Sequence, residues 1–421
     1  MSYRPRIVDQ ELRDQLAASG AVLIEGPKAC GKTETARQAA RSEVLLDLDG
    51  PARASGLLDP SLLLEGDTPR LLDEWQLVPA LWNQVRRTVD ARRTPGQFVL
   101  TGSAVPADDV TRHSGAGRIT RVRMRPMSTW EAGRSTGDVS LNALFSGQGA
   151  RAADSGLTVV DLADLVVRGG WPLHLGASTK AAMHQLTGYL RDVERTDVQR
   201  VDGVRRDPVK VQRLLRAYAR HVATSASLST IAADVGGDAP DSAAESAHRQ
   251  TITDYLVALE RLMVVEEQPA WAPHLRSRAR IRSASKRHFV DPSLATAALG
   301  AAPDRLLADP AFFGTLFESM VVRDLRVYAQ AADASVLHYR DNTGLEVDAI
   351  VERRDGAWAA FEVKLGVGAI DDAAATVLRF RAKVDAARSG PPAALAVIVG
   401  TGFGYRRPDG VDVIPIGALG P

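Results

Sequence analysis

A short glycine-containing segment between an apolar run and a helical pattern constrains the fold of this chain more than any other feature. Residues 26–33 read Gly-Pro-Lys-Ala-Cys-Gly-Lys-Thr, which fits the pattern G-x-x-x-x-G-K-[ST] completely. A strand is expected directly before it, over residues 21–24, and a helix directly after it, over residues 32–40. The two glycines let the backbone curl until several N–H groups face one point at the start of the helix. The N-terminal part of the chain is therefore predicted to be an α/β domain built on a parallel sheet.

The same segment has the chemistry of a nucleotide site. Lys32 is predicted to contact the β- and γ-phosphates of ATP, and Thr33 is predicted to ligate Mg²⁺ through its hydroxyl. Further along, an apolar strand ends in Asp73 and Glu74, which are predicted to hold Mg²⁺ and to polarise the attacking water, respectively. The residues predicted to bind the nucleotide are Gly26, Pro27, Lys28, Ala29, Cys30, Gly31, Lys32, Thr33 and Glu34.

Two further segments are candidates for sensing the γ-phosphate. The strand over residues 97–100 is followed by hydroxyl side chains, of which Thr101 or Ser103 is expected to face the phosphate. Arg118 follows a run of small residues and is predicted to be an arginine finger, in its own chain or from a neighbouring subunit. An arginine supplied by a neighbour would require a homo-oligomer, whereas one in the same chain would not.

Composition limits the class of protein and its compartment. A chain of 421 residues is expected to form two to four domains, and its net charge of +1 gives no global sign of a nucleic-acid binder. The one cysteine excludes an intramolecular disulfide framework and a zinc site built from cysteines. The start lacks the apolar region of a secretory signal, and no apolar run is long enough to span a bilayer. We therefore expect a cytoplasmic protein that does not associate with membranes.

The middle of the chain is predicted to contain three helices followed by a hairpin. The helices are expected over residues 214–222 and 228–234 and around residues 252–263, and the hairpin strands over residues 264–267 and 270–271. This order is typical of a winged helix, used either to read DNA or as a protein–protein spacer. A basic strip after it is a candidate for tracking phosphates, or else is a solvated edge strand. The strip comprises Arg276, Arg278, Arg280 and Arg282, which alternate at period two, followed by Lys286 and Arg287.

The C-terminal part carries an acid on a helix, an acid on a strand and an E-x-K pattern on the next strand. These residues are Glu318, Asp348, Glu362 and Lys364, and the pattern is typical of restriction-endonuclease-like nucleases. Glu318, Asp348 and Glu362 are predicted to bind one or two Mg²⁺ ions, and Lys364 is predicted to orient the attacking water or to stabilise the transition state. Lysine is scarce in this chain, with seven in 421 residues, so a lysine at this register carries weight. The nearby His288 and His338 are expected to be structural or exposed, and not catalytic.

Several motifs together resemble one family. GPKACGKT, LLDEWQ, FVLTGS, SGAGR and MRPMSTWE resemble a group of uncharacterised prokaryotic AAA-type ATPases whose phosphate-loop domain precedes a C-terminal domain of unknown function. GGWP (169–172), KRHFVDPSLA (286–295), LFESMVVRDL (316–325), GLEVDAIVE (344–352) and FEVKLG (361–366) resemble that C-terminal domain. The resemblance covers nearly the whole chain, and it implies an architecture more directly than a biological role.

The predicted fold class is α/β, in four segments of the chain. These are an AAA-like P-loop NTPase domain (1–135), a linker and helical region (136–205), a winged-helix-like domain (206–275) and a restriction-endonuclease-like α/β domain (276–421). The predicted function is Mg²⁺-dependent ATP hydrolysis coupled to a DNA-binding or nuclease-like module, in DNA processing, defence or a toxin–antitoxin-like system. The alternative is an ATP-dependent conformational switch or protein remodeler whose C-terminal domain is a catalytically inactive binding module.

Overall fold

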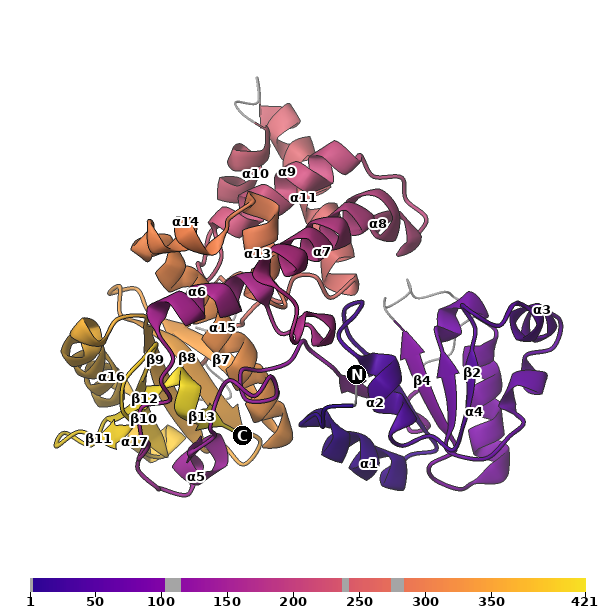
Figure 1. Cartoon of the computed structure of the whole chain (residues 1–421), viewed down its shortest axis with the longest axis horizontal. Coiled ribbons are helices and arrows are strands. Elements are labelled where there is room, and N and C mark those ends of the chain that lie inside the picture. Colours follow the sequence, from indigo (N-terminus) through magenta and orange to yellow (C-terminus); the bar gives the residue numbers. More distant parts are fainter. Residues whose placement is uncertain (1–2, 103–114, 237–241, 274–283) are drawn as a thin grey trace. The chain divides into compact units, whose positions relative to one another are not determined.

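The computed structural model describes residues 3–102, 115–236, 242–273 and 284–421 (Figure 1). The chain divides into two compact units. The N-terminal unit comprises Met1–Pro126 with Gln199–Val204 and Arg261–Met263. The C-terminal unit comprises Met127–Val198, Arg205–Glu260 and Val264–Pro421. Among the described residues, no helix combines the length and the apolar character needed to cross a bilayer.

The N-terminal unit is built on a five-stranded parallel sheet, which confirms the predicted parallel α/β domain. Its strands are β1 (Ala21–Glu25), β2 (Ser42–Leu45), β3 (Arg70–Asp73), β4 (Phe98–Gly102) and β5 (Ile119–Arg123), in the order β2-β3-β4-β1-β5. The helices of this unit include α1 (Val8–Ala18), α2 (Lys32–Arg37), α3 (Gly50–Leu58) and α4 (Leu81–Arg92). Both faces of the central strands are buried, so these strands are continuous apolar runs. Leu23, Phe98 and Trp82 belong to the core that joins α4 to this sheet.

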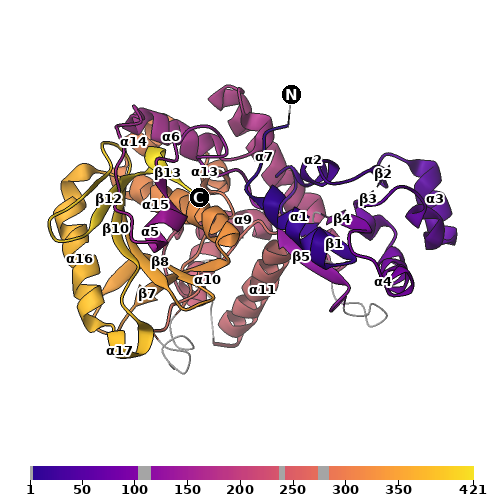
Figure 2. The same ribbon diagram turned by 90° about the horizontal axis from the view of Figure 1, so that it is seen from below.

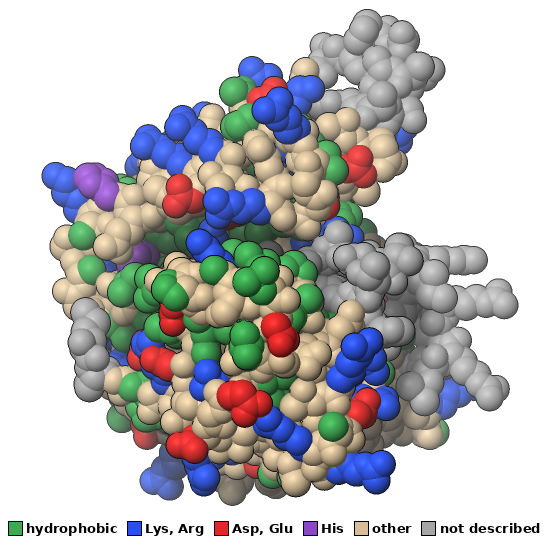
Figure 3. Space-filling view, turned by 90° about the vertical axis from the view of Figure 1, so that its right-hand side faces the viewer, with side chains coloured by type: hydrophobic (Ala, Val, Ile, Leu, Met, Phe, Trp, Pro, Cys, Tyr) green, Lys and Arg blue, Asp and Glu red, His purple; other side chains and the backbone are tan. Residues whose placement is uncertain are grey.

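An apolar patch lies on the outside of the N-terminal unit, around α3 and the 3₁₀ turn η1 (Pro60–Leu64) (Figure 3). Its exposed side chains are Leu48, Leu57, Leu58 and Leu62. Exposed patches of this kind are typical of surfaces that contact another macromolecule. The patch contributes no side chain to the two candidate sites described below.

The first part of the C-terminal unit is helical, in agreement with the helical region expected within residues 136–205. Its helices are α6 (Val159–Arg168), α7 (Thr179–Asp192), α8 (Val198–Arg200), α9 (Pro208–Arg220), α10 (Leu228–Gly236), α11 (Ser242–Arg261), α13 (Pro292–Leu299) and α14 (Pro303–Leu307), with a π-helical turn (Val193–Asp197) between α7 and α8. Before them, a short strand β6 (Val139–Ser140) pairs with β13 (Leu419–Gly420) and is followed by α5 (Leu141–Phe145). The three helices predicted for the middle region correspond to α9, α10 and α11.

The predicted hairpin after α11 is wrong in its second strand. Val265 pairs with Phe289 and Gln268 pairs with Lys286, both antiparallel, so the partner strand comes from beyond residue 283. Ala270 instead pairs with His338 of the C-terminal sheet. Trp271 packs there in the sheet's apolar core, with its ring centroid 5.2 Å from that of Trp358. Burial of this large aromatic side chain accounts for the recruitment of residues 270–271 to another sheet.

The rest of the C-terminal unit is an α/β domain with a mixed six-stranded sheet. Its strands are β7 (Ala334–Arg340), β8 (Glu346–Arg353), β9 (Trp358–Lys364), β10 (Ala394–Val399), β11 (Tyr405–Arg406) and β12 (Asp412–Pro415), in the order β11-β12-β10-β9-β8-β7. β9, β10 and β12 are parallel, and the other neighbouring pairs are antiparallel. The long helix α15 (Pro310–Ala331) and α16 (Ile370–Lys383) pack on this sheet from opposite sides (Figure 2), and the short α17 (Ala386–Ser389) precedes β10.

A buried ion network joins several motifs of the family resemblance within the C-terminal unit. The guanidinium of Arg323 on α15 donates to Asp291 (2.8 Å) and to Asp324 (2.7 Å), and all three side chains are almost fully buried. Asp291 also accepts the backbone N–H of Gly170 at 2.9 Å, and Asp324 accepts that of Thr129 at 3.1 Å. Burial opposes ionisation of Asp291, but the charge of Arg323 and these hydrogen bonds hold its pKa below the usual value. The motifs MSTWE, GGWP, FVDPSLA and VVRDL are therefore held together by structural contacts.

Candidate nucleotide site and C-terminal carboxylate cluster

The phosphate loop lies between β1 and α2, as predicted. Its backbone is left-handed at Ala29 (φ +61°) and at Gly31 (φ +103°), which curls the chain around the loop. A Cβ added at Gly26 would lie 2.4 Å from the carbonyl oxygen of Met124, so only glycine fits there. The local sequence thus fixes the loop conformation that backbone phosphate binding needs.

The loop and the acidic strand end meet at one point. The Thr33 hydroxyl donates to Oδ1 of Asp73 at 2.9 Å, and the Thr101 hydroxyl donates to the same oxygen. Thr101 can do so because β4 lies between β3 and β1 in the sheet. The Lys32 ammonium is buried and donates to the carbonyl oxygens of Gly26 (2.9 Å) and Pro27 (2.8 Å). Thr101 therefore contacts the Asp73 carboxylate, while Ser103 lies outside the described residues.

Glu74 differs from Asp73, the last residue of β3, in its backbone conformation. Its backbone is left-handed, with φ +52° and ψ +46°, which is uncommon for a residue with a side chain. The Gln76 side-chain amide donates to its carboxylate. Outlying backbone conformations of this kind cluster at functional sites. Asp73 thus faces Thr33, and Glu74 directly follows it at the end of β3.

The remaining loop residues have supporting positions. Cys30 is fully buried and packs against the backbone of Met124, which agrees with a packing role. Glu34 is exposed and pairs with Arg37 on α2. Sequence reasoning did not identify Arg6, whose buried guanidinium donates to the carbonyls of Cys30 (3.0 Å) and Arg125 (2.8 Å). Arg6 could not be identified from the sequence because its partners at the loop are backbone carbonyls, which carry no sequence signal.

The structure does not bring Arg118 to the nucleotide site of its own chain. β5 runs parallel to β1, and the backbone N–H of Ala21, at the start of β1, donates to the carbonyl of Arg118 at 3.0 Å. The phosphate loop follows the other end of β1. The Arg118 side chain is half exposed and pairs with Asp90 at 2.8 Å. The prediction of an arginine finger in cis is therefore wrong, because residues that precede a parallel strand lie at the opposite edge of the sheet.

The C-terminal acids gather where two strands diverge. A register shift in the β7–β8 pairing falls between Leu337 and Tyr339, and the β8–β9 ladder ends at the pair Ala349–Phe361. Just beyond this end, Oδ2 of Asp348 accepts the backbone N–H of Val363 at 2.9 Å. The Asp348 carboxylate thus accepts a backbone hydrogen bond from β9 just beyond the last regular pair of the β8–β9 ladder. The irregular pairing leaves the N–H of Val363 available to this acid.

Glu362 and Lys364 lie together, as the strand alternation predicts. The Lys364 ammonium donates to Oε2 of Glu362 at 2.7 Å and lies 3.5 Å from Oδ2 of Asp348. Asp348, Glu362 and Lys364 line a cavity of about 460 Å³. The cavity is also lined by Thr376, Arg379 and Lys383 of α16. The E-x-K pattern and the preceding acid therefore form one accessible site.

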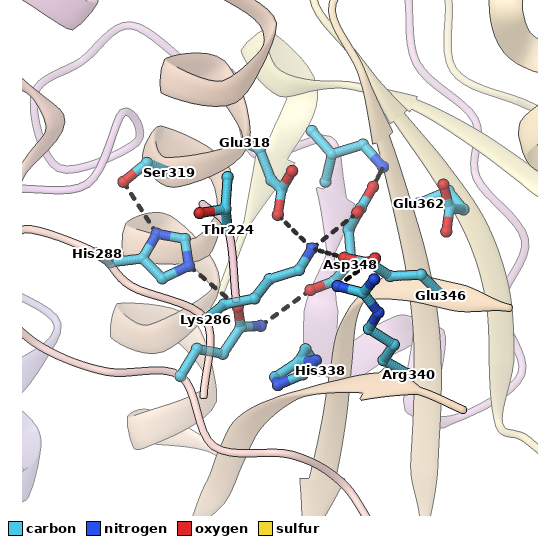
Figure 4. A network of polar contacts seen from close by, with 12 residues as sticks. Thr224, Lys286, His288, Glu318, Ser319, His338, Arg340, Glu346, Asp348 and Glu362 are labelled. Atoms are coloured by element: carbon cyan, nitrogen blue, oxygen red, sulfur yellow. Dashed lines mark hydrogen bonds and ion pairs between the residues drawn. The ribbon is translucent and has the colours of Figure 1, made fainter. Parts of the chain in front are cut away.

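Lys286 is the residue of this cluster whose role the sequence did not reveal (Figure 4). Its ammonium lies 2.8 Å from Oε1 of Glu318, 2.8 Å from Oε1 of Glu346 and 3.1 Å from Oδ1 of Asp348. The predicted exposed basic strip is wrong at this end, because Lys286 is almost fully buried and Arg287 is buried beside Glu267. The other members, Arg276, Arg278, Arg280 and Arg282, lie outside the described residues. Only tertiary contacts bring Lys286 to the acids.

The predicted metal site of three carboxylates is not formed. Within the described ranges, no group of three or more His, Cys, Asp or Glu side chains is arranged to hold a metal ion. The physical reason is the Lys286 ammonium, which occupies the space between Glu318 and Asp348. The residues present at this closed part of the cluster therefore do not fit a divalent cation.

The electrostatics of the cluster follow from burial. Burial, with the charge of Asp348, raises the pKa of Glu318 and that of Glu362 to about 8 each. Burial opposes ionisation of Asp348 too, but the charges of Lys286 and Lys364 hold its pKa below the usual value. Burial would also lower the pKa of Lys286, but its three carboxylate neighbours outweigh this and raise the pKa well above the usual value. Lys286 is therefore charged at neutral pH.

The two histidines are structural, as expected. His288 is fully buried between the hydroxyl of Ser319 and the side-chain oxygen of Gln268, each at 3.1 Å. Burial lowers its pKa well below the usual value, and burial followed by the charge of Lys286 lowers that of His338 to about 4. Gln268 in turn donates to the carbonyls of Leu337 (2.9 Å) and Asp348 (3.0 Å). This chain of contacts holds the β7–β8 region in place.

Comparisons with known proteins agree with this arrangement. Residues 18–133 match a family described as an AAA domain, residues 159–305 match a domain of unknown function (DUF8612), and residues 313–419 match a domain of unknown function (DUF4143). The chain is also similar to two uncharacterized proteins, one of Mycobacterium bovis and one of Mycobacterium tuberculosis. Each is 26% identical over 358 residues, which is 84% of this chain and 72% of the relative. These matches support an uncharacterised AAA-type ATPase family, with a P-loop ATPase domain at the N-terminus of the chain.

Proposed function

We propose that this chain is a Mg²⁺-dependent ATP hydrolase whose nucleotide cycle acts on DNA held by its C-terminal domain. The observation that carries the first half is the hydrogen bond of 2.9 Å between the Thr33 hydroxyl and Asp73. It joins two motifs that lie far apart in the sequence and that phosphate-loop ATPases use together. A hydroxyl beside a carboxylate also fits Mg²⁺, which prefers oxygen ligands.

The proposed hydrolysis assigns one role to each residue of the nucleotide site. Lys32 exchanges the carbonyls of Gly26 and Pro27 for phosphate oxygens when ATP binds. Thr33 and Asp73 would hold Mg²⁺, which neutralises charge on the phosphates when it is bound. Glu74 orients the attacking water and accepts its proton. The left-handed backbone of Glu74 at the end of β3 supports this role, because outlying backbone conformations cluster at functional sites.

We assign the C-terminal domain to the restriction-endonuclease-like class and propose that it binds DNA. The assignment is supported by the mixed sheet between helices and by Asp348, Glu362 and Lys364 on β8 and β9. The cavity beside them also presents Arg379 and Lys383, whose donors suit the oxygens of a phosphodiester. The three helices α9, α10 and α11 would add a winged-helix-like contact within the segment 206–275.

Cleavage of the bound DNA is the second candidate function, favoured by the meeting of Asp348, Glu362 and Lys364 at one cavity. We expect the wild-type protein to cut at least one of duplex, single-stranded and branched DNA in the presence of ATP and Mg²⁺ or Mn²⁺. Asp348→Asn and Lys364→Ala should abolish cutting, because each removes a charged group at the reacting phosphate. Gel electrophoresis of end-labelled substrates measures the products.

The control for this experiment is Lys180→Ala, which removes an exposed lysine of α7 outside the cluster and should leave cutting unchanged. Binding of the same DNA is followed in parallel by fluorescence anisotropy. DNA binding without cutting on every substrate would indicate a catalytically inactive binding module. Absence of both binding and cutting would contradict the proposal and favour a switch or remodeler that acts on protein.

A further inference from the structure

The ammonium of Lys286 lies where several carboxylates converge, a place that proteins commonly use for a divalent cation. Oxygens of Glu318, Glu346 and Asp348 surround it at 2.8, 2.8 and 3.1 Å (Figure 4). These are the distances of charge-assisted hydrogen bonds, whereas Mg²⁺ and Ca²⁺ bind oxygens at about 2.0–2.6 Å. The convergence is thus arranged around an ammonium and, as it stands, not around a metal ion.

We propose that Lys286 is a built-in cation that replaces a divalent ion among Glu318, Glu346 and Asp348 and keeps metal out of this part of the site. Glu318 is then the partner of Lys286 and not a metal ligand, contrary to the pattern from which it was predicted. The inference deepens the proposed function, because it concerns the same C-terminal site. Only the expectation of a metal ion at the C-terminal site comes from the proposed function.

The position of Lys286 is fixed by its backbone as well as by the acids. Lys286 and Gln268 exchange two backbone hydrogen bonds, at 2.8 and 3.0 Å. Two residues further on, His288 is held between Ser319 and Gln268. The backbone pairing of Lys286 and its side-chain neighbours thus both direct the ammonium to the carboxylates. The Lys286 side chain is also almost fully buried.

Asp348 separates this closed side of the cluster from the open side. Its Oδ1 contacts Lys286, while its Oδ2 accepts from Val363 and lies near Lys364. The acids that line the cavity are Glu346, Asp348 and Glu362, and neither Lys286 nor Glu318 lines it. An ion that enters the cavity therefore meets these three acids but not Glu318. The inference concerns only the closed side and holds whether or not the cavity takes an ion.

The test is direct measurement of Mn²⁺ binding to the full chain without nucleotide, using Mn²⁺ alone as the probe. Lys286→Met keeps the length of the side chain and removes its charge, so Glu318, Glu346 and Asp348 lose their shared cation. This variant should bind one Mn²⁺ ion more than the wild type does. The additional ion is detected by isothermal titration calorimetry and by loss of the electron paramagnetic resonance signal of free Mn²⁺. Lys286→Arg, which keeps the charge, and the double variant Lys286→Met/Glu318→Gln should not bind it.

A Lys286→Met variant that folds and binds no more Mn²⁺ than the wild type would overturn the inference. If Lys286→Met fails to fold, the wild type and Glu318→Gln are compared instead. Identical Mn²⁺ isotherms support the inference, and a tenfold or larger loss of affinity in Glu318→Gln contradicts it. None of these readouts involves DNA, so a protein that neither binds nor cuts DNA would defeat the proposed function and leave this result standing.

Discussion

Replacing Lys32 by alanine is expected to lower Mg²⁺-dependent ATP turnover by about 10²–10³-fold, the usual cost of losing a charged donor to a transition-state oxygen. Lys32 is the buried ammonium at the loop, and among the described residues it donates to the carbonyls of Gly26 and Pro27. Removing it takes away the positive charge that the β- and γ-phosphates would meet. Release of phosphate from ATP, measured at saturating Mg²⁺, gives the turnover. Unchanged turnover in Lys32→Ala would refute the assignment of this site.

Two comparison variants show whether the loss is specific. Lys180→Ala removes an exposed lysine of α7 and should hydrolyse ATP at the wild-type rate. Glu74→Gln keeps the shape of the side chain and removes the base, so it should lose about 10²–10⁴-fold in turnover but still bind ATP. Binding of a fluorescent ATP analogue separates the two losses. Lys32→Ala should bind the analogue weakly, whereas Glu74→Gln should bind it as the wild type does.

Replacing Arg323 by methionine is expected to destabilise the C-terminal unit by about 3–5 kcal/mol, because it leaves two buried carboxylates without their cation. Arg323 pairs with Asp291 and Asp324, and both carboxylates are fully buried. The same acids hold the backbone of Gly170 and Thr129, so the loss spreads to segments far apart in the sequence. Urea unfolding followed by circular dichroism measures the change in the free energy of unfolding.

The matched control is Arg354→Met, which breaks an ion pair of similar length at the surface. Arg354 lies 2.9 Å from Asp333, and both side chains are mostly exposed. Exposed pairs of this kind contribute at most about 1 kcal/mol, so this variant should unfold close to the wild type. Equal destabilisation by the two substitutions would show that the buried network has no special role in holding the motifs together.

The nucleotide site could be predicted from the sequence because its signals are local. Each group of site residues stands at the end of an apolar strand that can be recognised in the sequence. The loop glycines, Lys32 and Thr33 follow the first strand, and Asp73 and Glu74 stand at the end of β3. Parallel strands place their carboxyl ends on one edge, which brings Thr33 and Asp73 together. The same rule excludes Arg118, since it precedes its strand. The position of Arg118 follows from the sequence once the limits of β5 are known.

The C-terminal site could be predicted only in part. Alternation along β9 correctly placed Glu362 beside Lys364, because it depends on neighbours in one strand. Lys286, which follows the four alternating arginines of the predicted basic strip, is instead buried among acids that come from α15 and β8. Period-two alternation shows which residues share a face but not whether that face is covered. The second hairpin strand was misplaced for a similar reason, since Trp271 is buried in another sheet.

ATP turnover of the wild-type chain, measured with and without duplex DNA at fixed salt, tests most directly whether hydrolysis is coupled to DNA on the C-terminal domain. We expect DNA to raise wild-type turnover severalfold. In Lys364→Ala, turnover without DNA should equal that of the wild type, and added DNA should not raise it, because the altered residue belongs to the C-terminal cavity. Wild-type turnover that is identical with and without bound DNA would contradict the account.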